Sequence, residues 1–98
     1  MEYKNGYIIL DKQEITVLKI MFGTDIEASF EAIEFFRGMT DIRVSLIEER
    51  QRYLSMNDRG SREDAAISLL ELTIDVCEDY IAKAHEVSHQ AGRSIELH

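Results

Sequence analysis

The alternation of apolar and polar residues predicts helices over most of the chain, beginning with residues 12–22. In this segment polar residues recur every three or four positions and apolar residues fill the other side, which is helical periodicity. Asp11 fits a helix N-cap with Glu14 as its capping-box partner, and Gly23 fits a helix end. The same segment is rich in residues that favour strands, so a strand over residues 15–22 remains the alternative.

Two short helices are predicted in the middle of the chain. Thr24 begins a capping-box pattern, and apolar residues at helical spacing continue from it to about residue 37, where Gly38 ends the helix. Thr40 then caps a third helix over residues 41–55. We therefore expect a short turn at Gly38 between two helices.

The last predicted helix is the longest. Ser61 fits its N-cap, with Asp64 in the capping-box position, and the helical pattern continues to about Gln90, before Gly92. Such a helix is about 45 Å long, at 1.5 Å per residue. Its apolar band is wide as far as Ile81 and narrow afterwards. We expect the first half to be buried on more than one side, and the second half to project past the shorter helices or pack against a second copy.

The first ten residues differ from the rest, because Asn5-Gly6 is a strong signal for a two-residue hairpin turn. This segment is predicted to form a small hairpin, or one strand that pairs with a second subunit. The predicted fold is therefore all-α: a single four-helix domain over residues 1–98, with an extended segment at residues 1–10 and a tail at residues 93–98.

The length of the last helix suggests a homodimer. Three short helices cannot cover an apolar band of this length and width, so a second copy is expected to cover part of it. The predicted interface residues are Ala66, Leu70, Ile74, Cys77, Ile81, Ala84 and Val87.

The net charge limits which partners the protein can bind. The 98 residues include 19 acidic and 11 basic side chains, which gives a net charge of −8 and a pI near 4.8. Such a surface repels phosphate backbones and anionic lipids, so nucleic-acid and membrane binding are disfavoured and a basic protein partner is favoured. The acidity could also serve only to keep the protein in solution.

Cysteine usage points to a reducing compartment. Cys77 is the only cysteine, so no disulfide can form within the chain, and we expect a cytoplasmic protein with a structural thiol on an apolar helix face. The sequence has no signal-peptide pattern and no apolar run near the ~20 residues that a membrane span needs.

One short stretch carries a chemical motif. His85, Glu86 and His89 fit the pattern H-E-x-x-H, and Gly92 extends it to H-E-x-x-H-x-x-G. Histidines four residues apart lie one helical turn apart, so both rings can reach one zinc ion. The stretch resembles the zinc-protease signature. The resemblance implies zinc ligation by His85 and His89, and general-base catalysis by Glu86 on a metal-bound water.

The sequence departs from that family in several respects. The resemblance covers eight residues, and the third histidine of metzincin-type enzymes would fall at Ile95. Glu96 and His98 supply a carboxylate and an imidazole nearby, but at other spacings. The simpler interpretation is that two histidines at an exposed helix end match the pattern by chance.

The sequence contains two further candidate motifs. Carboxylates on neighbouring helices could bind magnesium, an arrangement similar to the paired acidic motifs of the all-α nucleotide pyrophosphohydrolases, although their E-x-x-D spacing is not reproduced. The simpler interpretation is a solvated helix face. The residues concerned are Glu31, Glu34, Glu71, Asp75, Glu78 and Asp79.

The other motif is a helix-turn-helix, because Gly38-Met39-Thr40 joins two predicted helices as that DNA-binding motif requires. Its reading helix would carry nearly as many acidic as basic residues, which favours a turn used only for packing. The one basic region could bind an anion or pair with neighbouring glutamates such as Glu48 and Glu49. It comprises Arg43, Arg50, Arg52, Arg59 and Arg62.

The leading functional hypothesis is therefore a non-enzymatic interaction module: a regulator, inhibitor or immunity-type factor that binds another macromolecule through an acidic helical surface. The alternatives are a zinc-dependent hydrolase centred on His85, Glu86 and His89, and a helix-turn-helix DNA-binding regulator.

Overall fold

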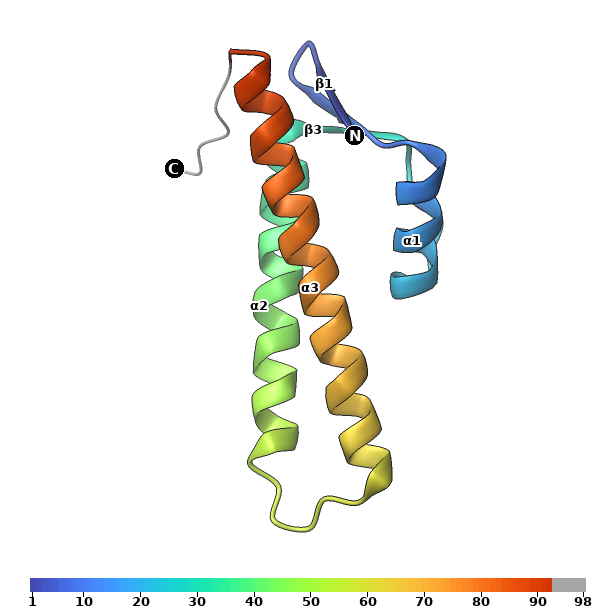
Figure 1. Cartoon of the computed structure of the whole chain (residues 1–98), viewed down its shortest axis with the longest axis vertical. Helices are drawn as coiled ribbons and strands as arrows, with labels where there is room; N and C mark the ends of the chain where they lie inside the picture. The colour runs from blue at the N-terminus through green and yellow to red at the C-terminus, as the bar shows by residue number, and fades with distance from the viewer. Residues whose placement is uncertain (93–98) are drawn as a thin grey trace.

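The computed structural model describes residues 1–92 and consists of a long helical hairpin with a small sheet and a short helix at one end (Figure 1). It measures 50 × 29 × 17 Å along its principal axes. No helix of the described part is long and apolar enough to cross a membrane. In chain order the elements are β1 (Glu2–Lys4), β2 (Tyr7–Ile9), α1 (Lys12–Phe22), β3 (Ser29–Glu31), α2 (Ala32–Leu54) and α3 (Ser61–Gln90).

The predicted N-terminal hairpin is confirmed. Asn5 and Gly6 both have positive φ angles, 52° and 86°, as a two-residue turn between antiparallel strands requires. β1 pairs with β2, and β2 also pairs with β3 in the register Ile8 opposite Phe30, so the sheet has three strands in the order β1-β2-β3. The third strand was not predicted.

Residues 12–22 form a helix rather than a strand. The Asp11 carboxylate accepts a hydrogen bond from the Glu14 N–H at 2.8 Å, and the Asp11 N–H donates to Glu14 Oε1 at 3.0 Å, which completes the predicted capping box. Gly23 ends α1 in a left-handed conformation, with φ at 65°.

The predictions of four helices and of a turn at Gly38 are wrong, because α2 runs unbroken from Ala32 to Leu54. A glycine inside a helix costs only about 1 kcal/mol relative to alanine, so Gly38 alone does not stop a helix that packs along its length. Thr24 caps no helix either; residues 24–28 form a loop that leads into β3. The pairing of β3 with β2 joins segments far apart in the sequence, and local capping patterns do not reveal it.

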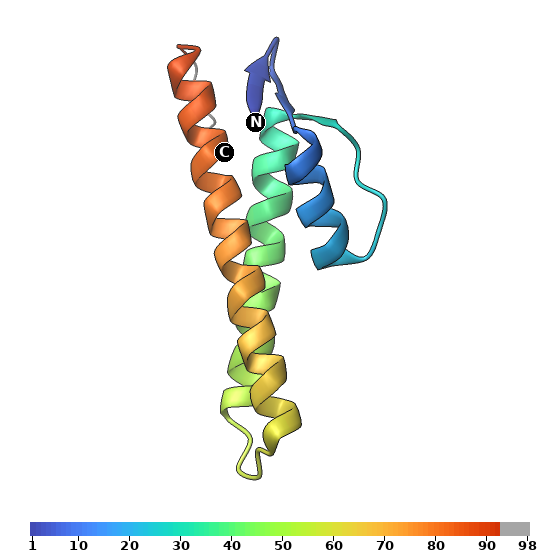
Figure 2. The same ribbon diagram turned by 45° about the vertical axis from the view of Figure 1, so that its right-hand side comes forward.

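The long last helix is confirmed as one continuous element that runs antiparallel to α2 (Figures 1 and 2). Its N-cap is Gly60 rather than Ser61, and the Gly60 N–H donates to Glu63 Oε2 at 3.0 Å. The capping interaction therefore lies one residue earlier than predicted. Ala91 follows the helix, and Gly92 has a φ of 75°, as expected for a helix end.

Burial along α3 is the reverse of what the sequence pattern indicates. The second half is the better covered one, because β1 and the N-terminal part of α2 pack beside it, and Tyr80 and Lys83 contact Glu14 of α1 (Figure 1). The first half extends past α1 towards the 55–60 loop, with only α2 beside it (Figure 1). Met39, predicted to lie in a turn, belongs to the core. The main core cluster comprises Ile8, Leu10, Leu18, Ala32, Phe35, Met39, Cys77, Tyr80 and Ala84, and Ile67 and Ile74 are also buried.

A buried carboxylate ties the short elements to α3. Glu14 is only 5 % exposed, and its oxygens lie 2.9 Å from the Met1 amino group and 3.8 Å from Lys83 Nζ. The Tyr80 hydroxyl lies 3.5 Å from the backbone oxygen of Glu14. A buried charge is tolerated only when it is paired and hydrogen-bonded, so this cluster holds α1 and the start of the chain against α3.

Candidate functional site

The three residues of the H-E-x-x-H stretch lie exposed on the last two turns of α3. The His85 ring packs edge-on against Phe36 of α2, with ring centroids 4.4 Å apart. Glu86 accepts a hydrogen bond from the Gln90 side chain at 3.4 Å. An edge-to-face aromatic contact contributes to helix packing, so His85 has a structural role in the hairpin.

Within residues 1–92, no three side chains of the types that ligate metals come together. His85 and His89 are therefore left without a third protein ligand in the described part of the chain, whereas a catalytic zinc site has three. Ile95, Glu96 and His98 lie outside the described residues.

The acidic residues of the possible magnesium site do not converge either. Glu31 and Glu34 lie where β3 joins α2, whereas Glu71, Asp75 and Asp79 project from the solvent side of α3. None of them belongs to a metal-binding group in the part of the chain that the structure covers. Their arrangement is that of a solvated helix face.

The helix-turn-helix geometry is absent, since Gly38, Met39 and Thr40 all lie inside α2. The basic side chains pair mainly with nearby carboxylates: Arg43 with Glu78 at 3.7 Å, Arg59 with Asp64 at 3.9 Å, and Arg52 with Glu49. Arg50 Nε is buried without a hydrogen-bond partner in residues 1–92.

The predicted interface residues on α3 fall into two groups. Ile74, Cys77 and Ala84 are 4 % exposed or less, so their side chains are contacts of the core within one chain. The other four are only partly covered: Ala66, Leu70, Ile81 and Val87.

Two leucines one helical turn apart on α3, which the sequence pattern did not mark as a site, are exposed. Leu69 and Leu72 are 60 % and 59 % exposed. They lie on the same side of α3 as Thr73 and Tyr80, which contact α1. The Thr73 hydroxyl lies 3.6 Å from Met21 Sδ, and the Tyr80 hydroxyl lies 3.5 Å from the Glu14 backbone oxygen. Met21, which contacts Thr73, is followed by Phe22 at the end of α1, and Leu69 and Leu72 stay exposed. We call Leu69 and Leu72 the leucine row.

The negative charge of the protein is concentrated on α3. This helix has seven acidic residues and two basic ones, a net charge of 2 − 7 = −5 out of −8 for the whole chain, whereas α2 has four of each. Glu71, Asp75 and Asp79 are exposed, recur every four residues beside the leucine row, and form no ion pair within residues 1–92. We call these three residues the acidic stripe.

The single thiol is inaccessible. Cys77 is fully buried, and burial raises the pKa of its thiol above the usual 9.0. Burial, followed by the negative charge of Glu14, likewise raises the pKa of Tyr80 above 10.0. A buried thiol that resists ionisation is a poor nucleophile, which agrees with the structural role expected for Cys77.

An apolar pocket lies where α1, the 23–28 loop, β3 and α2 meet. Its volume is about 230 Å³, and Glu34 is the single charged residue among those that line it in the described chain. Gly38 also lines it, and a Cβ atom added there would meet no atom within 4 Å. We call this the Gly38 pocket. Its apolar lining includes Leu18, Phe22, Ile26, Phe30, Met39 and Ile42.

The sequence does not reveal this pocket, because a glycine that follows a helical stretch predicts a helix end. The only local signal is a glycine within an otherwise regular helical pattern, and such a glycine often has a packing or functional reason.

Comparisons of the chain with protein-family models, with curated proteins and with solved structures find no match.

Proposed function

We propose that this protein is a non-enzymatic interaction module that binds a basic protein partner through α3. The observation that carries the proposal is the leucine row, two large apolar side chains exposed side by side where α1 ends. Scattered single apolar residues are normal on a surface, but adjacent ones beside unpaired charges are typical of a binding surface.

The acidic stripe supplies the charge complementarity. Asp75 lies one helical turn from Leu72, and Asp79 one turn further on, so apolar and negative groups alternate along one side of α3. A partner helix with leucine-like residues on one face and lysine or arginine at its edges would match this pattern. Exposed charges mainly accelerate and orient association, while the leucines supply the apolar contact area.

The experiment that tests the proposal is affinity capture from the source cell with matched variants. The double variant Leu69→Ser/Leu72→Ser removes the leucine row, and Ile20→Ser removes a single exposed apolar residue, 76 % exposed, on α1. A specific partner should be lost with the double variant and retained with Ile20→Ser. Loss with both variants, or with neither, contradicts a site at the leucine row.

Charge is tested in the same way. Glu71→Lys/Asp75→Lys changes the net charge by the same amount as the control Glu48→Lys/Asp58→Lys, whose exposed residues lie outside α3. Only the first pair should weaken capture, and added salt should weaken it as well. Equal effects of the two pairs would mean that overall charge, rather than the acidic stripe, governs binding.

The expected homodimer is a second proposal for the same surface. A two-fold pair would bury the leucine row of both copies but would also bring their acidic stripes together. Such a dimer should therefore strengthen with added salt, which is the opposite of a basic partner. Sedimentation at tens of micromolar, in about 0.05 M and 0.5 M salt, separates the two; only an 11.3 kDa species in both argues against the dimer.

We further propose a cytoplasmic location without nucleic-acid or membrane binding, on the basis of the single cysteine and the net charge of −8. A zinc-dependent hydrolase and a DNA-binding regulator remain weaker candidates. The first has two histidines without a third ligand within residues 1–92, and the second lacks its helical turn. Retention of the protein on duplex DNA at low salt would favour the DNA-binding regulator.

A further inference from the structure

We propose that the Gly38 pocket receives an apolar side chain of a basic protein segment, with a neighbouring lysine or arginine of that segment paired to Glu34. The inference rests on the proposed function for the class of partner, but it concerns a different surface that shares no residue with the leucine row.

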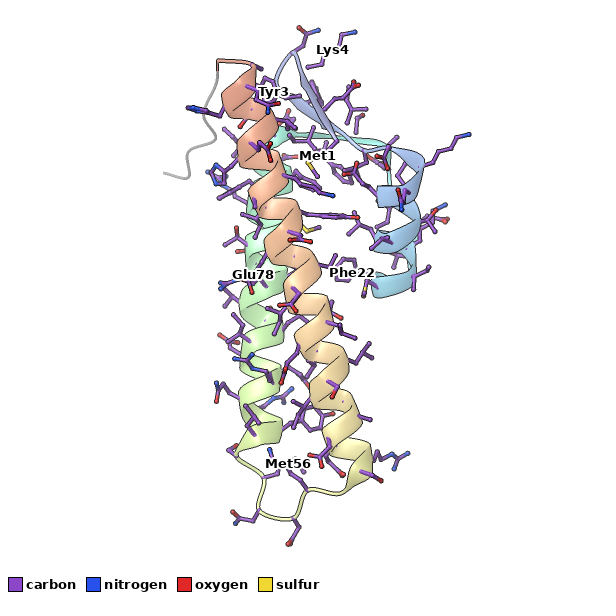
Figure 3. All side chains as sticks on the ribbon, in the orientation of Figure 1. Met1, Tyr3, Lys4, Phe22, Met56 and Glu78 are labelled. Carbon is purple, nitrogen blue, oxygen red and sulfur yellow. The ribbon has the colours of Figure 1, made fainter. Side chains whose placement is uncertain are left out.

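The size and chemistry of the pocket fit one large apolar group. Its volume of about 230 Å³ exceeds the roughly 150 Å³ of an apolar cavity that holds benzene in another protein. Phe22, at the end of α1, points towards the helical hairpin (Figure 3) and lines the pocket together with Phe30 and Ile42. A leucine or phenylalanine side chain placed there would be surrounded by aliphatic and aromatic carbon.

Gly38 is the residue that the fold itself does not explain. It has an ordinary helical backbone, and a Cβ atom at this position would meet nothing within 4 Å. Neither backbone conformation nor packing within the chain requires glycine, and almost any other residue would favour the helix more. Its absent side chain leaves the pocket open, which is what a ligand would need.

The charge around the pocket selects a cation. Glu34 lies on its lining and is exposed to solvent, so its carboxylate can meet a charged group outside the apolar part. Asp25 and Glu27 flank Ile26, another lining residue, and residues 23–31 contain three acidic side chains and no basic one. A lysine or arginine beside the inserted side chain is therefore favoured over a carboxylate.

The test uses the full chain and defined probes, with ¹⁵N chemical shifts of residues 18–42 as the readout. Three acetylated tetrapeptide amides share a Leu-Phe centre and carry lysine, glutamine or glutamate at both ends; free 4-phenylbutylamine is the fourth probe. The lysine peptide should bind about threefold more tightly than the glutamine peptide, and the glutamate peptide should bind most weakly. Glu34→Gln should reduce these differences while leaving binding of the glutamine peptide unchanged.

Two further variants test the location. Gly38→Leu should fill the pocket and weaken the lysine peptide at least tenfold without unfolding the chain, since its Cβ meets open space. Val44→Leu, on a part of α2 that does not line the pocket, should have no effect.

The proposal is overturned if no peptide causes saturable chemical-shift changes, or if Gly38→Leu binds the lysine peptide as tightly as the wild-type chain does. It is overturned as well if the glutamate peptide binds as tightly as the lysine peptide. It is also overturned if 4-phenylbutylamine binds more tightly than the lysine peptide, because the pocket would then select a small amine. None of these results depends on the leucine row or the acidic stripe, so failure here is distinguishable from failure of the proposed function.

Discussion

The substitution Gly38→Ala tests whether α2 is continuous. The sign of the change in the free energy of unfolding gives the answer. In a continuous helix the substitution favours folding, because glycine is about 0.8–1.0 kcal/mol less favourable than alanine in a helix interior. No atom lies within 4 Å of the added Cβ, so no steric cost opposes this gain. The expected increase in the free energy of unfolding is therefore about 1 kcal/mol. For a domain of this size it corresponds to a rise in Tm of roughly 4–8 °C.

The local sequence predicts a turn at this position, and a turn gives the opposite result. A helix-ending glycine adopts a left-handed conformation, in which alanine costs about 1–2 kcal/mol. Gly23 is the matched control, because it ends α1 with a φ of 65°. Urea unfolding followed by circular dichroism at 222 nm should place Gly38→Ala above and Gly23→Ala below the wild-type protein. A lower midpoint for Gly38→Ala would refute the continuous helix and the pocket that depends on it.

Three further predictions concern particular side chains. His85→Ala should lower the free energy of unfolding by about 0.5–1 kcal/mol, because the edge-on contact with Phe36 is lost. His89→Ala should change it by less than about 0.5 kcal/mol. Binding of about one zinc per chain that is lost in His89→Ala would contradict the purely structural role of this helix end. Asp11→Ala should cost about 1 kcal/mol, measured by the same urea titration, because it removes the N-cap of α1. Burial raises the pKa of the Cys77 thiol above 9.0, so above pH 9 the unfolded chain releases a proton that the folded chain retains, and the free energy of unfolding falls as pH rises. Urea midpoints between pH 8 and 10 should decline less steeply in Cys77→Ala, and an equal decline would show that other groups are responsible.

Local signals predicted the elements whose stability depends on neighbouring residues in the chain. Asn5-Gly6 specifies a hairpin turn because both residues tolerate positive φ. Asp11 and Glu14 satisfy each other's backbone N–H groups, which begins α1 at the predicted residue. The long periodic stretch without proline specifies the single helix α3.

The candidate sites depended less on local pattern. The H-E-x-x-H stretch was visible in the sequence, but its meaning changed when His85 was found packed against Phe36. The concentration of charge on α3 could have been counted from the sequence alone. The exposure of Leu69 and Leu72 could not, because it depends on where α1 ends relative to α3.

The sequence by itself thus determined the helical class, the first hairpin, the caps of α1 and the unbroken length of α3, because each follows from contacts within a few residues. Only the tertiary structure decided that residues 29–31 pair with β2, that α2 continues through Gly38, and that the second half of α3 is the better covered one. Contacts between distant segments outweigh a local preference of about 1 kcal/mol per residue, and these contacts cannot be deduced from spacing along the chain.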